Sequence, residues 1–508
     1  MNKVIDSYKA AELIKDNSCV GFGGFVGIGH PEELSSAIEQ RFLQTGGPTN
    51  LTIIYAAGQG DGYNRGINNL AHERLVKRVI GGHWGLAPKM GKLAVENKIE
   101  AYNFPQGVIT HLYRDIAAKK PGTITHVGLK TFIDPRISGG KLNDKDCPDL
   151  VEIIKINNEE WLFYKSFPID VALIRGTTAD EEGNISMERE AGSLEMLPLA
   201  QASKNSGGFV ICQVERIVKK GTLNPWMVKV PGILVDYIVI AKPDNHWQTF
   251  EERYNPSLSG EIKTPLHLIP GMILDERKII CRRALKEISN NAIVNLGIGL
   301  PEGISIVANE SGMLEKIKLT VEAGTIGGIP ASGLNFGAAY NPECIIDQPS
   351  QFDFYDGGGL DIAFLGMAQV DRYGNVNVSK FADRLAGCGG FINITKSTGK
   401  VVFCGTLKSG ELKVEIDNGR IWIKKEGKYK KFIAAVEQIT FSGEYSKLKN
   451  QDVLYITERG VFKLTDEGIM LVEIAPGIDL KKNIIEQMDF KPLISSELKF
   501  MDEEIFID

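Results

Sequence analysis

The stretch GFGGFVGIGHPEEL, residues 21–34, decides the fold, because its second half returns later in the chain. GIGHPEEL at Gly27–Leu34 recurs as GIGLPEGI at Gly297–Ile304. Each copy follows an apolar segment typical of a buried strand, and each places proline and glutamate where a helix would begin. The recurrence predicts a related strand–turn–helix unit in each half of the chain.

A second recurrence, in the same order along the chain, supports two related halves. DVALIRGTTADEEGNIS, from Asp170, is matched by DIAFLGMAQVDRYGNVNVS, from Asp361. Both patterns predict a buried strand, a small-residue segment and an Asp-x-x-Gly-Asn turn into another strand. Either pair alone is compatible with chance similarity of glycine-rich strings, whereas two pairs in one order favour related halves.

These units predict an α/β protein in which each half is a largely parallel sheet covered by helices. A chain of 508 residues is long enough for such an arrangement. We expect an N-terminal domain at 1–241, a proline-containing polar connector at 242–272 and a C-terminal domain at 273–508. Alternating residues at 411–441 predict an antiparallel β appendage on the second half.

Composition and charge exclude several classes of partner. A net charge of -6 and a pI near 5.8 give no reason to expect nucleic acid. The apolar runs are too short to span a bilayer, and the first residues lack a signal-peptide pattern. The seven cysteines form no CxxC pair and no Cys/His cluster, so neither a metal site nor a disulfide framework is predicted. We therefore expect a reduced, cytoplasmic protein without a membrane partner.

The glycine-rich turns do not match a dinucleotide-binding fingerprint. G-x-G-x-x-G needs a third glycine, but from Gly21 the sixth residue is Val26, and from Gly27 or Gly297 it is glutamate. A glutamate in the first helical turn also occupies the positive end of the helix dipole, which a pyrophosphate would need. A nicotinamide dehydrogenase is therefore disfavoured, and a turn close to a substrate pocket is favoured.

KLTVEAGTIGGIP, residues 318–330, places a single carboxylate, Glu322, where a predicted strand opens into glycines. A carboxylate is a weak nucleophile, yet it can attack an activated acyl group such as a thioester, because a thiolate leaves readily. Glycine-rich loops supply backbone donors for the oxyanion that forms. From the residues alone, Glu322 is either such a nucleophile or a glutamate that caps a turn.

Four stretches together resemble the family I coenzyme A transferases. They are TVEAGTIGGIP, VNLGIGLPEGI, FPQGVITHLYRDIAAKKPG and GCGGFINITKSTGKVVFCGTL. The likeness covers nearly the whole chain and is strongest to the single-chain acetate/propionate and 3-oxoacid CoA-transferases. It implies an enzyme that exchanges CoA between a short-chain acyl-CoA and a free carboxylate. It also implies no metal and no permanently bound cofactor, with CoA as the substrate moiety.

The resemblance also implies roles for individual residues. Glu322 would be the nucleophile, which forms an acyl-glutamyl anhydride and then a glutamyl-CoA thioester, and Gln106 would lie beside the reacting carbonyl from the other half. The other implied residues are Gly387, Gly389 and Gly390 in the loop facing the thioester, Gly23, Gly24 and Phe25 in the acyl pocket, and Lys396, Lys400 and Lys408 as candidates for the CoA phosphates.

One departure bears on the substrate. Ala323 stands where the 3-oxoacid transferases carry asparagine, and this favours the acetate/propionate group. A 3-oxoacid CoA-transferase, an acyl-CoA hydrolase on the same fold and a non-catalytic acyl-CoA-binding protein remain alternatives. Cys388, between glycines, is expected to be a tolerated small residue. The resemblance further implies a homodimer or homotetramer.

Overall fold

The computed structural model describes residues 3–266 and 270–507, and the chain divides into two compact units. Unit 1 comprises Met1–Lys263, Val321–Asp353 and Asp383–Asn393, and unit 2 comprises Thr264–Thr320, Phe354–Ala382 and Ile394–Asp508. Two segments of the second half, one of which contains Glu322, therefore belong to unit 1 with the N-terminal half. Residues 267–269 of the predicted connector lie outside the described residues.

Unit 1 is built on a seven-stranded sheet of order β14-β11-β8-β1-β2-β3-β4, in which every neighbouring pair is parallel. The strands are β1 (Cys19–Phe22), β2 (Leu51–Tyr55), β3 (Val76–Gly81), β4 (Glu100–Asn103), β8 (Val171–Arg175), β11 (Phe209–Val214) and β14 (Tyr237–Ile240). All residues of β1 and β8 are buried, as expected for strands covered on both faces. The chain builds the sheet outward from β1 in both directions, so the topological switch lies between β1 and β8.

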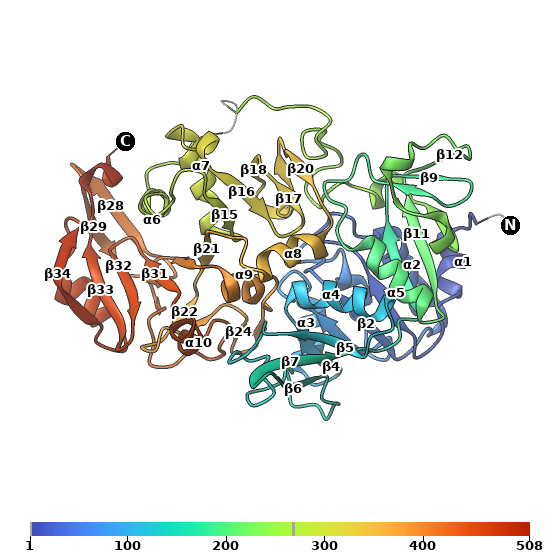
Figure 1. The fold of residues 1–508 in the computed structure, drawn as a ribbon, viewed down its shortest axis with the longest axis horizontal. Coiled ribbons are helices and arrows are strands. Elements are labelled where there is room, and N and C mark those ends of the chain that lie inside the picture. The colour runs from blue at the N-terminus through green and yellow to red at the C-terminus, as the bar shows by residue number, and fades with distance from the viewer. Residues whose placement is uncertain (1–2, 267–269, 508) are drawn as a thin grey trace. The chain divides into compact units, whose positions relative to one another are not determined.

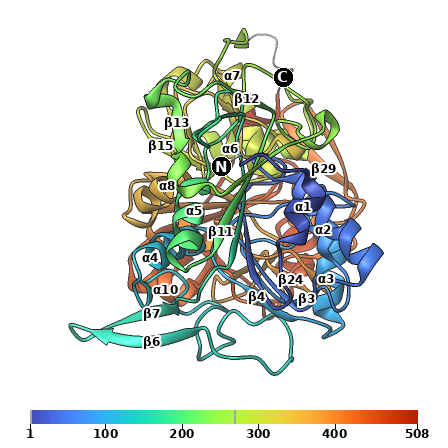
Figure 2. The same ribbon diagram turned by 90° about the vertical axis from the view of Figure 1, so that its right-hand side faces the viewer.

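Helices cover both faces of this sheet. They are α1 (Ser7–Glu12), α2 (Glu32–Thr45), α3 (Pro88–Val95), α4 (Gln106–Ala117) and α5 (Met196–Asn205). Figure 2 shows α1 and α2 together on one side and α4 and α5 together on the other. In α4, Val108, Leu112 and Ile116 are buried at helical spacing, which holds the helix against the sheet.

Smaller strands complete unit 1. One antiparallel sheet consists of β5 (Gly122–Thr125), β7 (Glu159–Lys165) and β6 (Val151–Ile156). A mixed sheet consists of β12 (Arg216–Val218), β9 (Thr178–Asp180), β10 (Ile185–Ser186) and β13 (Val228–Val230). Two antiparallel pairs are formed by β17 (Thr325–Ile326) with β20 (Cys344–Ile345) and by β18 (Ile329–Pro330) with β19 (Ala339–Tyr340). Strand β25 (Arg384–Leu385) also lies in this unit, and α8 (Gln348–Asp356) and α9 (Phe391–Ser397) begin in it.

Unit 2 contains a second sheet (Figure 1), whose strands follow the order β16-β15-β21-β26-β31-β32-β33-β34. These are β16 (Lys318–Val321), β15 (Ile293–Leu296), β21 (Ile362–Gly366), β26 (Lys400–Cys404), β31 (Asp452–Ile456), β32 (Gly460–Thr465), β33 (Gly468–Ile474) and β34 (Leu493–Phe500). The pairs from β16 to β31 are parallel, and the two pairs that β32 makes are antiparallel. The predicted α/β class, with a largely parallel sheet in each half, is confirmed.

The predicted antiparallel appendage is present as two pairs of strands. Strand β28 (Lys413–Asp417) pairs with β29 (Arg420–Lys425), and β27 (Lys408–Ser409) pairs with β30 (Tyr429–Lys430). The remaining elements are α6 (Glu276–Leu285), α7 (Gly303–Glu310), α10 (Gly443–Leu448), β22 (Gln369–Val370), β23 (Val376–Asn377) and β24 (Lys380–Phe381). No helix in the described part of the chain is long and apolar enough to cross a membrane.

The second recurrence corresponds to two turns of the same structure. Asp180 accepts the backbone N–H of Asn184 at 3.0 Å, and Asp371 accepts that of Asn375 at 3.1 Å. Each asparagine side chain donates a further hydrogen bond of 2.9 Å to the second carboxylate oxygen. These carboxylates satisfy the turn in place of backbone carbonyls, which explains why both copies keep aspartate and asparagine.

The strand that begins each recurrent unit is also held in the same way. Asp170 accepts the backbone N–H of Cys19 at 2.7 Å, and Asp361 accepts that of Ile293 at 2.7 Å. In each unit a strand, a glycine turn and a helix follow, β1 with α2 and β15 with α7. Equivalent hydrogen bonds therefore occur within each half, in addition to the recurring sequence patterns.

Candidate active site

The candidate site is built on the carboxyl ends of β3 and β4, where α/β sheets place their ligand crevices. Residues 386–390, which we call the glycine loop, lie against these ends. The Gly389 N–H donates to the Gly82 carbonyl at 2.7 Å, and the Gln106 N–H donates to the Gly389 carbonyl at 2.9 Å. Gln106 and the glycine loop, far apart in the sequence, are thus brought together within unit 1.

Asn103, the last residue of β4, fixes the same loop from the sheet. Its Nδ2 donates to the carbonyls of Gly81 at 2.8 Å and Gly82 at 2.6 Å, and its Oδ1 accepts the Cys388 N–H at 2.9 Å. Asn103 is not among the residues predicted from the sequence. Its signal was a polar side chain at the end of a buried strand, three residues before Gln106.

Two glycines of the loop adopt a backbone that other residues rarely accept. Gly387 has φ +81° and Gly389 has φ +52°. A β-carbon at Gly387 would lie only 2.9 Å from the His83 Cα and from the Trp84 nitrogen, both backbone atoms. Only glycine therefore lets the loop approach the end of β3 this closely.

Glu322 follows directly after β16, with its side chain buried against this loop. The residue is 9 % exposed, and among residues 3–266 and 270–507 no cation or hydrogen-bond donor contacts its carboxylate. A β-carbon at Gly390 would lie 3.2 Å from both Cδ and Oε2 of Glu322, so the carboxylate leaves no room for a side chain at position 390. Burial raises the pKa of Glu322 to about 7, because no neighbouring charge offsets the loss of water.

Two buried N–H groups, one in the glycine loop and one in the Gln106 side chain, are unpaired within the described residues. The Gly390 N–H makes no hydrogen bond, and the Gln106 Nε2 is buried without a partner. Buried donors are nearly always paired in folded proteins, so both call for an explanation. Donors of this kind, fixed in a site shielded from water, stabilise an oxyanion that forms during acyl transfer.

The turn that follows Glu322 also requires glycine. Gly324 has φ +111°, and a β-carbon there would lie 2.2 Å from the Ile346 carbonyl oxygen. The Ile346 N–H donates to the Gly324 carbonyl at 2.9 Å, which fixes this close approach. Ala323, between Glu322 and Gly324 in the sequence, is completely buried. Glycine at position 324 is thus a steric requirement of the turn that carries the carboxylate.

The predicted acyl pocket residues follow β1 in the same unit. The Gly24 N–H donates to Glu195 Oε1 at 3.1 Å, and Glu195 is completely buried. Burial raises the pKa of Glu195 to about 8, so this acid is protonated at neutral pH. The ring of Phe25 lies 5.7 Å from that of Phe336, in the segment after Glu322. Gly23 precedes them, and its N–H donates to the carbonyl of Leu173, in the middle of β8, at 3.1 Å.

The loop after Phe25 holds a strained backbone. Val26 has φ +56°, which is a genuine outlier for a β-branched residue. Its N–H donates to Gly58 at 2.6 Å and its carbonyl accepts from Gly60 at 3.1 Å, so the strain is maintained by the neighbouring loop. Such strain is typical of loops that contact ligands.

The three predicted CoA-binding lysines lie in unit 2. The Lys396 Nζ lies 3.1 Å from the centroid of a tyrosine ring, Tyr445, and the residue is buried. The Lys400 Nζ lies 2.5 Å from a carboxylate oxygen of Glu287, and the Lys408 Nζ donates to a glutamine side chain at 3.0 Å. Each ammonium group thus has a partner within unit 2, and their role toward CoA stays a prediction.

The cysteine and the metal alternatives receive no support from the described residues. Burial raises the pKa of the Cys388 thiol, so the thiolate that a cysteine nucleophile needs is disfavoured at neutral pH. No group of three or more His, Cys, Asp or Glu side chains in the described ranges is placed to hold a metal ion. The role of Glu322 as the nucleophile stays a prediction.

The raised pKa of Glu322 predicts a pH dependence for a reaction in which this residue is the nucleophile. The predicted attacking group is the carboxylate, so kcat/KM is expected to fall about tenfold per pH unit below about 7 and to level off above it. Glu195, with a pKa of about 8, titrates nearby, so the profile is measured for Glu195→Gln as well. The acid limb should persist in that variant. An exchange rate independent of pH from about 5 to 8 would contradict the assignment.

Comparison with known proteins finds coenzyme A transferases, both as a family model and as relatives. A family model described as coenzyme A transferase matches residues 6–241. A caffeate CoA-transferase of Acetobacterium woodii is 51 % identical over 512 residues, covering 100 % of this chain and 98 % of the relative. The acetate CoA-transferase YdiF of Escherichia coli K12 is 46 % identical over 508 residues, covering 99 % of this chain and 95 % of the relative.

The fold is similar to that of a solved structure over its whole length. This is a crystal structure of an acyl-CoA transferase, YdiF of Escherichia coli O157:H7, in a thioester complex with CoA. It is 45 % identical, with a TM-score of 0.95, and the match covers 100 % of this chain and 96 % of the other. The arrangement described for each unit is thus one that an experimental structure also contains.

Proposed function

The chain belongs to the coenzyme A transferase family, and on that basis we propose that it exchanges CoA between a short-chain acyl-CoA and a free carboxylate through Glu322. That it is a CoA-transferase follows from relatives of 51 % and 46 % identity matched over nearly their full length. The acyl groups and the catalytic residues are the proposed part.

One observation carries the assignment of Glu322. Its carboxylate is buried, meets no cation or donor in the described residues, and lies 3.2 Å from where a β-carbon of residue 390 would be. A buried carboxylate without a partner is costly, so a structural role such as capping a turn is disfavoured. The unpaired N–H groups of Gly390 and Gln106 provide what an acyl transfer at this carboxylate needs.

The first half of the proposed reaction forms an anhydride. The Glu322 carboxylate attacks the thioester carbonyl carbon, and the negative charge that develops on the carbonyl oxygen is stabilised by the Gly390 and Gln106 donors. The C–S bond then breaks, and the CoA thiolate leaves with the electron pair. The product is a mixed anhydride between Glu322 and the acyl group, and no proton is transferred.

The second half moves CoA onto the enzyme and then to the acceptor. The thiolate attacks the Glu322 carbonyl of the anhydride and releases the first acid as its carboxylate. The resulting glutamyl-CoA thioester is attacked by the acceptor carboxylate, and the same steps run in reverse to give the new acyl-CoA. Atoms and charges balance without an oxidant, metal or further cofactor, so we propose that no cofactor is bound permanently.

The acetate/propionate type of substrate is supported by two features. The buried Ala323 keeps the turn at Glu322 small, and Gly23, Gly24 and Phe25 follow β1 in the same unit. The relatives named after 3-ketoacid transfer are only 24–27 % identical and are matched over 77 % of this chain. The two full-length relatives described above are named for acids of very different size, acetate and caffeate.

Transfer and hydrolysis are separated by one assay on the purified protein. Acetyl-CoA is offered with propionate, with caffeate, with acetoacetate or with no acceptor, and both acyl-CoA product and free CoA are measured. We expect propionyl-CoA to form fastest, with free CoA release at least about a hundredfold slower. Hydrolysis that is unaffected by an acceptor would favour the acyl-CoA hydrolase, and fastest transfer to acetoacetate would favour the 3-oxoacid enzyme.

The remaining partners of the proposed enzyme are acyl-CoA, carboxylic acids and further copies of this chain. We propose a homodimer or homotetramer, which light scattering of the purified protein measures. A cytoplasmic location is supported by the seven cysteines, which are all free in the described structure, because thiols stay reduced in that compartment.

A further inference from the structure

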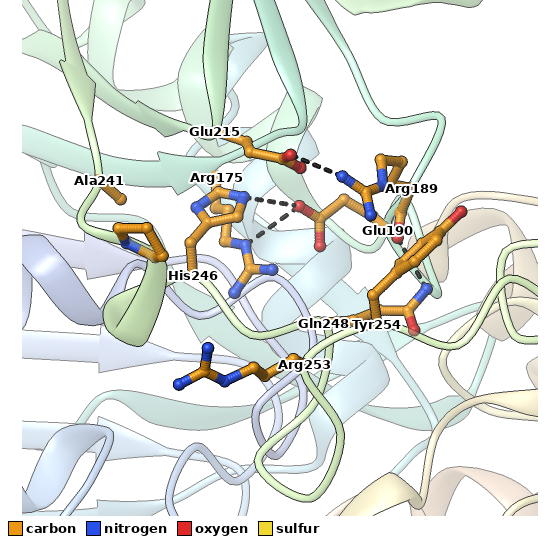
Figure 3. Close-up of a pocket in the computed structure, with 10 residues that line it drawn as sticks. Arg175, Arg189, Glu190, Glu215, Ala241, His246, Gln248, Arg253 and Tyr254 are labelled. Carbon is orange, nitrogen blue, oxygen red and sulfur yellow. Dashed lines mark hydrogen bonds and ion pairs between the residues drawn. The ribbon is translucent and has the colours of Figure 1, made fainter.

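Unit 1 contains a cavity of about 230 Å³ at the carboxyl ends of β8, β11 and β14 (Figure 3). One wall is formed by the residues at or just after these strand ends, Arg175, Glu215 and Ala241. The carboxyl edge of a parallel sheet is where α/β proteins bind ligands. None of the residues that line this cavity belongs to the glycine loop or to the turn of Glu322.

The opposite wall comes from the first part of the predicted connector. Pro243, His246, Gln248, Arg253 and Tyr254 line the cavity from this side. The segment is attached to unit 1 by side chains, because Gln248 Nε2 donates to the Arg189 carbonyl at 2.7 Å. The Arg189 guanidinium carbon also lies 3.7 Å from the centroid of the Tyr254 ring. The connector therefore closes a built cavity over the sheet edge.

Arg175 is a buried cation whose donors are mostly unused. It is 3 % exposed, and its Nε donates to Glu190 Oε1 at 3.1 Å while Nη1 reaches the His30 carbonyl only at 3.4 Å. Within the described residues its Nη2 makes no hydrogen bond. A guanidinium has five N–H donors in a planar fork that suits a carboxylate. Arg175 thus has N–H groups without hydrogen-bond partners at the edge of the cavity.

The neighbouring groups have defined charges. Burial acts to raise the pKa of Glu190, but the charge of Arg175 and the contact with His246 outweigh it, so this pKa is lowered and Glu190 is ionised. Burial and Arg175 lower the pKa of His246, which is therefore neutral. The His246 Nδ1 accepts from Gln213 Nε2 at 3.2 Å, so its proton is on Nε2, facing Glu190 at 3.5 Å (Figure 3).

The charged side chains that line the cavity have a net charge of about +1, which one negative charge would neutralise. Its lining contains three arginines, Arg175, Arg189 and Arg253, and two glutamates, Glu190 and Glu215. The Arg189 Nη1 bonds Glu215 at 2.6 Å, and Arg175 bonds Glu190, which leaves Arg253 at the mouth. Its only ion pair in the described structure is with Asp244, whose side chain is 79 % exposed and therefore a weak competitor.

We propose that this cavity is a second binding site, for a short-chain monocarboxylate whose carboxylate lies between the guanidinium groups of Arg175 and Arg253. The apolar walls formed by Ala241, Pro243 and the Tyr254 ring suit a short alkyl chain. A phosphate dianion brings a second negative charge toward Glu190 and Glu215 and is disfavoured. The inference does not depend on the role of Glu322.

The test uses the full chain and the fluorescence of Trp247 as a local reporter. The Arg253 guanidinium carbon lies 5.3 Å from the centroid of the Trp247 ring, so an anion bound at Arg253 changes the surroundings of the indole. Sodium propionate is titrated at constant ionic strength, and the Trp247→Phe variant identifies the signal from this one of five tryptophans. We expect a saturable change that is absent in Trp247→Phe and absent when ethylammonium chloride replaces propionate.

Variants then locate the binding. Arg253→Gln, at an exposed position, should weaken propionate binding about tenfold, because a charge-assisted hydrogen bond is lost. Ala241→Leu should abolish it by filling the cavity. Arg372→Gln removes an exposed arginine of unit 2 and should have no effect, and Glu322→Gln should leave this binding unchanged.

Three results would overturn the proposal. The first is the absence of any saturable change up to about 0.1 M propionate, a concentration that detects even a very weak site. The second is an affinity that stays the same in both Arg253→Gln and Ala241→Leu. The third is tighter binding of inorganic phosphate than of propionate, which would show a site for a more highly charged anion.

Discussion

Replacing Glu322 by alanine is expected to lower kcat/KM for CoA exchange by at least about 10⁴-fold, because the reaction then has no group on which to hold the acyl and CoA moieties. The site offers no substitute nucleophile among the described residues, since Cys388 is a buried thiol with a raised pKa. Exchange is measured as the formation of propionyl-CoA from acetyl-CoA and propionate. An exchange rate in Glu322→Ala within about tenfold of the wild type would refute the mechanism.

Glu322→Gln keeps the shape of the side chain, so this variant is expected to fold. Burial raises the pKa of Glu322 from 4.5 to about 7, so the stability that its bound proton provides is complete below pH 4.5 and lost as the pH rises through 7. Above that pH the wild type carries a buried, unpaired charge. Denaturant unfolding at about pH 8 should therefore show Glu322→Gln to be more stable, by roughly 3 kcal/mol.

A second buried glutamate provides the matched control. Glu302 follows the glycine turn in the second copy of the first recurrence, is 9 % exposed, and has a pKa raised by burial to about 7. It lies in unit 2, in the chain segment that ends at Thr320. Glu302→Gln should keep full exchange activity. Loss of activity in this variant comparable to that of Glu322→Gln would mean that burial of glutamates, and not nucleophilic attack, explains the effect.

Gly390→Ala is expected to lower kcat/KM by about 10- to 100-fold while the protein remains folded. The new methyl group would lie 3.2 Å from Cδ and Oε2 of Glu322 and 3.2 Å from the Phe352 ring. Such contacts force the carboxylate to move by a few tenths of an ångström, away from the N–H groups that would hold the oxyanion. Because Gly390 has no positive φ, the effect comes from this contact and not from backbone strain.

Gly91→Ala is the control for this prediction. Gly91 lies in α3 of the same unit, and a β-carbon there meets nothing within 4 Å. Alanine also favours a helix over glycine, by up to about 1 kcal/mol, so this variant should be fully active and slightly more stable. Full exchange activity in Gly390→Ala would contradict the close packing of the loop against Glu322.

Much of the fold could be predicted from the sequence because the two recurrences report local structure. The paired strand–turn–helix units and the turns at Asp180 and Asp371 depend on neighbours within about ten residues. The division into compact units could not be predicted in the same way. Val321–Asp353 and Asp383–Asn393 belong to unit 1 through contacts with residues more than 200 positions away, such as the bond from Gln106 to Gly389.

The candidate site was predictable in part for a related reason. Glu322 stood out because a charged residue at the end of an apolar strand breaks the local pattern, and the family resemblance pointed to Gln106 and the glycine loop. Asn103 and Glu195 were missed because their roles depend on which backbone groups lie opposite them in the folded chain. The positive φ of Val26 had no signal in the sequence, since β-branched residues disfavour it.

The charged cavity behind the connector was missed for a different reason. The connector has weak apolar periodicity, so it was interpreted as a linker between domains. In the structure its polar side chains contribute to a cavity, through Gln248 and Arg253 in particular. Polar segments without periodicity can still form built sites when they cover the edge of a sheet.

The most direct test of the central claim is to trap the covalent intermediate. The protein is incubated with acetyl-CoA, treated with borohydride and digested, and the peptide that contains Glu322 is examined by mass spectrometry. A glutamyl-CoA thioester is reduced to the alcohol, so we predict a loss of 14 Da, about the mass change from carboxyl to hydroxymethyl, at Glu322 and only when acetyl-CoA is present. An unmodified Glu322 under conditions in which exchange proceeds, or the modification of another residue, would contradict the account.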